Sequence, residues 1–176
     1  MIESLNRVEI SLSALCHNFL LLKEKSDDKP VLAMVKADAY GHGMVECAKA
    51  LSGVGADCFG VAEAVEGVTL RKAGIEQPVF IMAGIVPAVF PALFQYNLTP
   101  VVVDSTCLAG LSSEAELRKQ PIAVHLKVDA GMGRQGCSLD SVAEITGMIN
   151  RLPGLDLRGI MAHLPMADNQ HSDSTE

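Results

Sequence analysis

Short apolar runs alternate with segments of helical periodicity along almost the whole chain. The first clear run, residues 31–35, is continuously apolar, which is typical of a strand buried on both faces. In the following segment, residues 42–54, the apolar residues Val45, Ala48 and Leu51 recur at a spacing of three. That spacing predicts a helix with one apolar face.

The same alternation continues towards the end of the chain. Further strands are predicted at residues 58–62, 78–83, 98–103, 122–128 and 157–164, and further helices at residues 63–73, 88–96, 105–119 and 138–152. Asp104 or Ser105 is placed to cap the helix that runs to Lys119. A strand at residues 8–10 and a helix at residues 13–25 are predicted before the series.

Strands that alternate with helices predict a parallel sheet with right-handed crossovers. An open doubly wound sheet and a closed barrel both satisfy this pattern, but no GxGxxG follows the first strand, which disfavours the dinucleotide-binding open sheet. A (β/α)₈ barrel of the TIM type needs eight units and about 250 residues. We therefore expect residues 1–176 to be one α/β barrel domain with about six of the eight units, truncated before the last ones. Its unpaired edge strands should make this length of chain poorly soluble or prone to associate.

Composition and charge narrow the class of protein. Hydrophobic residues make up 49% of the chain, so it must bury a sizeable core, and the net charge of −7 without any basic cluster disfavours nucleic acid and anionic membranes as partners. No apolar stretch precedes Glu3, and the longest apolar run contains Pro87 and Pro91, so neither a signal peptide nor a membrane span is expected. Five cysteines without a CxxC pair indicate reduced thiols and no zinc site. These features predict a cytoplasmic protein without a bound metal.

Lys36 is the first residue of interest, within the segment VKADAYGHG at residues 35–43. It follows an apolar strand at the end where α/β barrels gather their active sites. Desolvation there favours the neutral, nucleophilic amine that a Schiff base requires, although a lysine at a strand end also commonly reaches out to water. Tyr40 and the glycines at positions 41 and 43 could present a hydroxyl and backbone amides to a phosphate.

Two further segments end later strands. KVDAGMGRQG, at residues 127–136, has two glycines shortly before Arg134, which permit a tight loop that aims the guanidinium inward, although such an arginine is commonly a surface residue. MAHLPMAD, at residues 161–168, places His163 at the end of the last predicted strand. A lone histidine among apolar residues is more often a packed core residue than a ligand.

All three segments resemble motifs of the alanine racemase family, and the resemblance runs through essentially the whole chain. The first is similar to the cofactor-lysine segment, which implies that Lys36 binds pyridoxal 5′-phosphate (PLP) covalently and that Tyr40 contacts its phosphate. The second resembles DxGMGRxG, which implies that Arg134 contacts the phenolic oxygen of PLP and orients the substrate carboxylate. It also implies that Lys127 is a candidate for carbamylation. The third resembles HxxxAD, which implies that His163 packs on the pyridine ring.

The resemblance also implies a fold type III PLP enzyme that interconverts L- and D-alanine and supplies D-alanine for peptidoglycan. Lys36 would serve as the base on one face of the substrate, while the family takes the second base, a tyrosine, from the C-terminal β-domain of a partner subunit. Only Tyr40 and Tyr96 are present here, and neither lies in a matching motif. We therefore expect a homodimer for the complete protein and no racemisation by residues 1–176 alone.

Three other functions are compatible with the sequence. A related single-domain barrel family carries PLP without catalysing racemisation. Racemases for serine or for a broader range of amino acids share the same motifs. A regulatory module that folds as an open sheet and binds no cofactor would show no absorbance change with PLP and no borohydride-trapped adduct at Lys36.

Overall fold

The computed structural model describes residues 6–27 and 29–167. The elements run in the order α1 Leu12–Lys25, β1 Leu32–Met34, α2 Lys36–Gly41, α3 Met44–Gly53, β2 Cys58–Val61, α4 Ala64–Lys72, β3 Val79–Ile81, η1 Pro87–Val89, α5 Phe90–Gln95, β4 Thr99–Val102, α6 Leu108–Arg118, β5 Ile122–Lys127, η2 Leu139–Ser141, α7 Val142–Arg151 and β6 Leu155–Met161. The predicted series of strand–helix units is therefore present, with ends that shift by a few residues.

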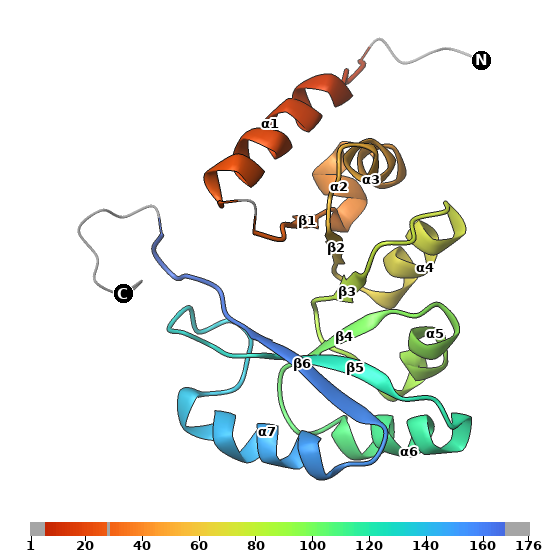
Figure 1. Ribbon diagram of the computed structural model, residues 1–176, viewed down its shortest axis with the longest axis vertical. Helices are drawn as coiled ribbons and strands as arrows, with labels where there is room; N and C mark the ends of the chain where they lie inside the picture. The colour runs from red at the N-terminus through yellow and green to blue at the C-terminus, as the bar shows by residue number, and fades with distance from the viewer. Residues whose placement is uncertain (1–5, 28, 168–176) are drawn as a thin grey trace.

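The six strands form one parallel sheet in the order β1-β2-β3-β4-β5-β6. A doubly wound sheet would reverse its strand order at a switch point, and this sheet does not. Helices α3 to α7 follow one another along the right and lower sides of the curved sheet in Figure 1. This arrangement is that of a partial (β/α)₈ barrel, with β1 and β6 as the two edge strands of the sheet. The fold class expected from the sequence is confirmed.

The two faces of β5 differ, as the pleat of a strand requires. Ile122, Val124 and Leu126 are buried, whereas His125 points to the other face and meets the ring of Phe80 edge-on, with centroids 4.8 Å apart. A side chain on Gly159 of β6 could not fit, because an added Cβ would lie 2.6 Å from the His125 ring. Burial lowers the pKa of His125, so the imidazole is neutral near pH 7. His125 is thus a half-buried histidine packed between Phe80 and Gly159.

The strand predicted at residues 8–10 is wrong. Residues 6–10 form no regular element, and Val8 is 83% exposed. An isolated extended segment has no ladder of hydrogen bonds to stabilise it, and within the described part of the chain no strand pairs with these residues. The apolar pattern of the segment alone could not reveal this.

The helices predicted at residues 105–119 and 88–96 both differ from the observed ones near their starts. The helix predicted at residues 105–119 starts at Leu108, because the Asp104 carboxylate accepts the N–H of Thr106 at 2.8 Å and closes a turn before the helix. The helix expected at residues 88–96 divides into η1 and α5, each with a proline near its start, since proline lacks the N–H that a continuous helix needs.

Across the described ranges, no helix combines the length and the apolarity needed to cross a bilayer.

The last strand is displaced towards its amino-terminal end. It was expected at residues 157–164, but β6 covers Leu155–Met161, directly after a turn at Gly154 with φ +76°. Its pairing with β5 begins at Ile122 and stops where Lys127 meets Met161. The neighbouring strand, which is not visible in a local pattern, therefore decides where β6 ends.

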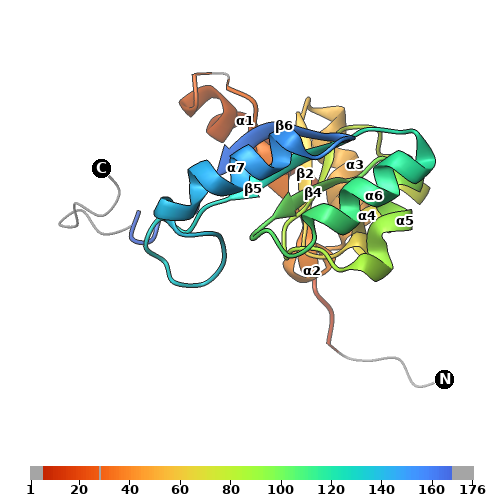
Figure 2. The same ribbon diagram turned by 90° about the horizontal axis from the view of Figure 1, so that it is seen from below.

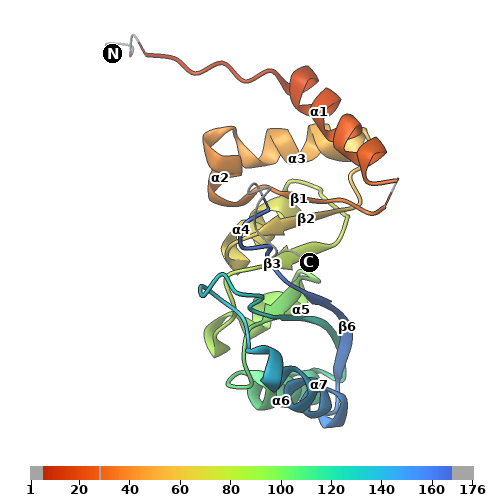
Figure 3. The same ribbon diagram turned by 90° about the vertical axis from the view of Figure 1, so that its left-hand side faces the viewer.

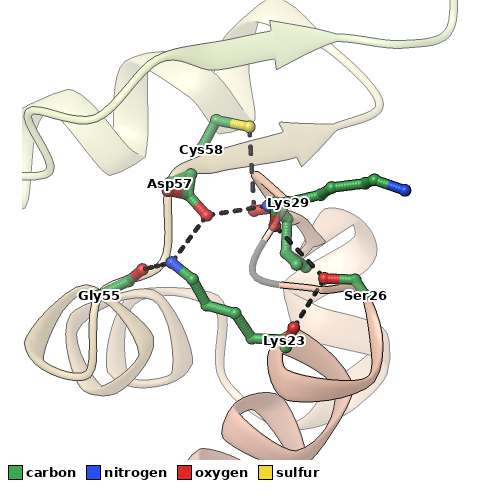
Figure 4. Close-up of polar contacts among 7 residues, drawn as sticks. Lys23, Ser26, Lys29, Gly55, Asp57 and Cys58 are labelled. Atoms are coloured by element: carbon green, nitrogen blue, oxygen red, sulfur yellow. Dashed lines mark hydrogen bonds and ion pairs between the residues drawn. The ribbon is translucent and has the colours of Figure 1, made fainter.

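A polar cluster ties α1 to the amino-terminal ends of β1 and β2 (Figure 4). Lys23 donates to the carbonyl of Gly55 at 3.0 Å and to the Asp57 carboxylate at 3.1 Å, and Asp57 also accepts the N–H of Val31 at 2.8 Å. The hydrogen bond from Val31, followed by that from Lys23, lowers the pKa of Asp57. This end of a barrel contributes to stability, whereas the opposite end carries catalysis.

Candidate active site

The residues proposed from the sequence lie at the carboxyl ends of three strands. Lys36 follows β1, Lys127 is the last residue of β5, and His163 comes two residues after β6. Because all the strands are parallel, these ends point to one side of the sheet. Figures 2 and 3 both show α2, after β1, and the loop after β5 on the same side of the molecule.

Lys36 is half-buried at the start of a tight turn. The Val35 N–H continues the β1–β2 ladder to the carbonyl of Gly60 at 2.9 Å, so the backbone before the lysine is held in the sheet. The Lys36 ammonium nitrogen lies 5.9 Å from the centroid of the Tyr40 ring, and Tyr40 is 60% exposed. The structure thus brings the predicted amine and the predicted phenol together.

The turn after Lys36 is left-handed. Residues 37–40, which include no glycine, all have φ between 50° and 56°. L-residues avoid this region at a cost of about 1–2 kcal/mol each, so neighbouring groups must hold the turn in place. Asp38 does so in part, because its side chain accepts the N–H of Met44 at 2.7 Å and its carbonyl accepts that of Gly43 at 2.9 Å. The sequence suggested that the Gly43 amide could bind a phosphate, but this amide already donates a hydrogen bond to the Asp38 carbonyl.

A second group of residues surrounds a small cavity beyond β5. Lys127, Arg134 and His163 line it together with Val128, Asp129, Ala130, Met132 and Gln135. Lys127 is only 8% exposed. Burial, and then the positive charge of Arg134, lowers the pKa of Lys127, while Asp129 acts in the opposite direction. Arg134 and His163 are exposed.

The loop that carries Arg134 is organised by its first residue. One carboxylate oxygen of Asp129 accepts the N–H groups of Gly131 at 2.9 Å and Gly133 at 3.0 Å, and these bonds lower the pKa of Asp129. The side chain of Gln135 donates to the carbonyl of Met82 at 3.0 Å, which fastens the loop to the end of β3. At Gly136, an added Cβ would lie 2.6 Å from the backbone nitrogen of Asp129. Only glycine fits this close approach of two backbone segments.

The structure therefore gathers the candidate residues in two groups. Lys127, Arg134 and His163 share one cavity beyond β5 and β6. Lys36 and Tyr40 follow β1, the strand at the other edge of the sheet. Both groups lie beyond the carboxyl ends of the parallel strands. Asp168, the end of the third motif, lies outside the described residues. Among residues 6–27 and 29–167, no three metal-ligating side chains of the His, Cys, Asp and Glu types come together.

Sequence reasoning missed the roles of two acidic residues. Glu66 of α4 accepts backbone N–H groups from Ala37 at 2.6 Å, Ala62 at 2.7 Å and Glu63 at 3.0 Å. The spacing of Glu63 and Glu66 at the start of a predicted helix is that of a capping box and could have indicated the bond to Glu63. Asp129, two residues before a glycine, has the spacing of an Asx turn. Nothing local could have indicated the bond from Ala37, which lies on another strand–helix unit.

A parallel sheet in strict chain order, with the candidate residues beyond the carboxyl ends of its strands, is the arrangement of an α/β-barrel domain. The family model described as "Alanine racemase, N-terminal domain" matches residues 10–176. The chain belongs to this family, as the three motifs suggested.

Individual relatives agree with the family match. The alanine racemase of Nostoc sp. is 39% identical over 166 residues, and that of Geobacter sp. strain M21 is 40% identical over 164 residues. Each match covers 92% of this chain and 43% of the relative. The chain therefore spans less than half the length of these curated relatives.

Solved structures show the same arrangement. Alanine racemase from Clostridium difficile 630 superposes with a TM-score of 0.86 at 31% identity, covering 93% of this chain and 44% of that one. A histidine racemase from Leuconostoc mesenteroides subsp. sake also has a TM-score of 0.86, at 26% identity and the same coverage. One backbone arrangement thus occurs in racemases named for different amino acids.

Proposed function

We propose that this chain is the lysine-bearing barrel part of a PLP-dependent alanine racemase. The observation that supports this most directly is the position of Lys36, half-buried at the carboxyl end of β1 beside Tyr40, in a chain that matches the family over residues 10–176. The curated relatives named above are alanine racemases. The proposal includes a cytoplasmic homodimer that supplies D-alanine for peptidoglycan.

The side chains present fit PLP. Lys36 offers a primary amine for the aldehyde, Tyr40 offers a hydroxyl four residues later for the phosphate, and Arg134 offers a guanidinium for the phenolic oxygen and the substrate carboxylate. When bound, PLP would absorb the electron pair left by departure of the substrate α-proton. His163 is the proposed packing partner of the ring.

The residues of this chain would then handle one of two proton transfers. The Lys36 amine takes the α-proton on one face of the substrate and can return it on the same side. Inversion needs a second base on the other face, which we assign to a tyrosine of the partner's C-terminal domain. The loop of Asp129–Gly136 would keep Arg134 in place while the proton moves.

Racemisation by the complete protein is the direct test. With PLP and L-alanine, we expect D-alanine to accumulate until the two enantiomers are equal, as measured by chiral chromatography. Residues 1–176 alone should form none, because they lack the second base. The proposal is wrong if the complete protein binds PLP at Lys36 but forms no D-amino acid.

We also propose that Lys127 is carbamylated. Its lowered pKa leaves more neutral amine near pH 7 to 8, which is the form that attacks CO₂, and the resulting anion would face Arg134. Native mass spectrometry in bicarbonate should show a gain of one CO₂, and ¹³C-bicarbonate should give a carbamate resonance. Both signals should disappear in Lys127→Met and persist in Lys49→Met, at an exposed position. Their absence from the native protein at pH 8 would exclude the modification.

A racemase for another amino acid is the second candidate. A histidine racemase whose structure superposes on this chain with a TM-score of 0.86 supports this candidate. Parallel assays with L-alanine, L-serine and L-histidine distinguish the candidates. Alanine should have the highest kcat/KM if the curated relatives indicate the substrate.

A further inference from the structure

We propose that Glu66 is a positioning residue for Lys36, an inference that rests on the proposed function. Glu66 lies on α4, after β2, and does not line the cavity around Lys127. One of its carboxylate oxygens, Oε1, accepts the N–H of Ala37, the residue that directly follows Lys36, at 2.6 Å. The carboxylate therefore holds the peptide from which the reactive lysine projects.

The same carboxylate also fixes the start of its own helix. Its second oxygen, Oε2, accepts the N–H groups of Ala62 and Glu63 at 2.7 and 3.0 Å. Hydrogen bonds to an ionised acceptor are about twice as strong as neutral ones, and three of them restrict one side chain to one position. Glu66 thus joins the loop after β1 to the loop after β2 at the carboxyl edge of the sheet.

The backbone of the Lys36 turn needs such a partner. Residues 37–40 are left-handed, and Ala37, with φ 50° and ψ 53°, is the first of them. Release of the Ala37 N–H would remove one of the bonds that oppose relaxation of the turn to ordinary backbone angles, and the one nearest to Lys36. Because Lys36 is the preceding residue, rotation at Ala37 would redirect the lysine side chain. A displacement of 1 Å can cost an active site about 100-fold in rate.

Glu66→Gln separates the two tasks of the side chain. A glutamine has one carbonyl oxygen and one NH₂ group, and the oxygen can accept two bonds. With that oxygen directed at Ala62 and Glu63, the helix start keeps its partners, but the NH₂ group then faces the N–H of Ala37. Two donors cannot bond to each other, so the contact with the lysine turn is lost while the cap of α4 is retained.

The experiment uses the complete protein and measures capture of PLP at Lys36, apart from turnover. We expect Glu66→Gln to slow formation of the borohydride-trapped adduct at Lys36 by about 10-fold to 100-fold, and to lower kcat for racemisation more than it changes KM. Glu66→Asp, which withdraws the carboxylate by one methylene, should give an intermediate rate. The melting temperature of each variant is recorded alongside.

Glu63→Gln is the matched control. It removes one charge from the same start of α4 without altering the N–H groups that Glu66 binds, and its adduct should form within about twofold of the native rate. A purely structural role for Glu66 would lower the melting temperature of Glu66→Gln and leave the trapping rate of the folded protein unchanged. That result would overturn the inference.

Hydrogen exchange of the native protein provides a measurement that needs no variant. The Ala37 amide should exchange slowly if Glu66 holds it, and rapid exchange would contradict the inference even if Glu66→Gln failed to fold. Failure of the proposed function looks different, because the native protein itself would then form no adduct at Lys36. Native capture together with unaltered capture by Glu66→Gln would exclude only the positioning role.

Discussion

Replacing Lys36 with alanine is expected to abolish covalent capture of PLP and to slow racemisation by the complete protein by about 10³-fold or more. The lysine is assigned two roles, as the amine that captures the aldehyde and as the base on one face of the substrate, and loss of a general base alone costs about 10²–10⁴-fold. The checks are the visible absorbance after addition of PLP, peptide mapping after borohydride reduction, and the rate of D-alanine formation.

Two further substitutions test whether the amine of Lys36 itself is required. Lys36→Arg keeps a long basic side chain at the end of β1, but its guanidinium stays protonated and cannot act as a nucleophile or base, so this variant should be as inactive as Lys36→Ala. Lys49→Ala removes a lysine from the exposed face of α3 and should retain native activity. If Lys36→Ala captured PLP at the native rate, the active site would have to lie elsewhere.

Gly136→Ala is expected to have the second largest effect, through the loop that carries Arg134. The new Cβ would lie 2.6 Å from the nitrogen of Asp129 and 2.7 Å from the carbonyl carbon of Val128, both backbone atoms that cannot turn aside. A φ of +126° adds strain that glycine does not have. We expect a loss of stability on the order of 3 kcal/mol, measured by urea unfolding, and about 100-fold lower kcat/KM as Arg134 shifts.

Two other glycines show whether space or conformation is responsible. At Gly133 an added Cβ meets nothing within 4 Å, so Gly133→Ala should cost only the left-handed conformation at φ +67°, about 1–2 kcal/mol. Gly53 is helical and equally open, so Gly53→Ala should stabilise the protein by about 0.5–1 kcal/mol. Equal effects at all three positions would show that the close approach at Gly136 is not the cause.

Much of the fold could be predicted because each strand–helix unit is encoded locally. The apolar run before Lys36 and the spacing of apolar residues after it identify β1 and α3 without reference to any other part of the chain. The prediction failed where an element depends on a partner. Val8 lies in a strand-like sequence that pairs with no strand in the described residues, and β6 ends where its pairing with β5 ends, at Met161.

The candidate site divides in the same way. Lys36, Tyr40, Arg134 and His163 were proposed as site residues from the sequence, because their segments resemble motifs of the alanine racemase family. The role of Glu66 could not be predicted in this way, since its hydrogen bond to Ala37 joins residues 29 positions apart. Neither segment has a local pattern that indicates the contact. The order of the strands brings these two loops together.

The sequence by itself determined which residue types stand at which strand ends, and with them the family and the amine proposed to react. Only the tertiary structure decided how those residues are held. It showed that the turn after Lys36 is left-handed and is held by an acid from the next unit, and that Lys127, Arg134 and His163 share one cavity. The physical reason is that hydrogen bonds and burial depend on distance in space. Which strands and loops become neighbours in the folded sheet cannot be deduced from any single local segment of the chain.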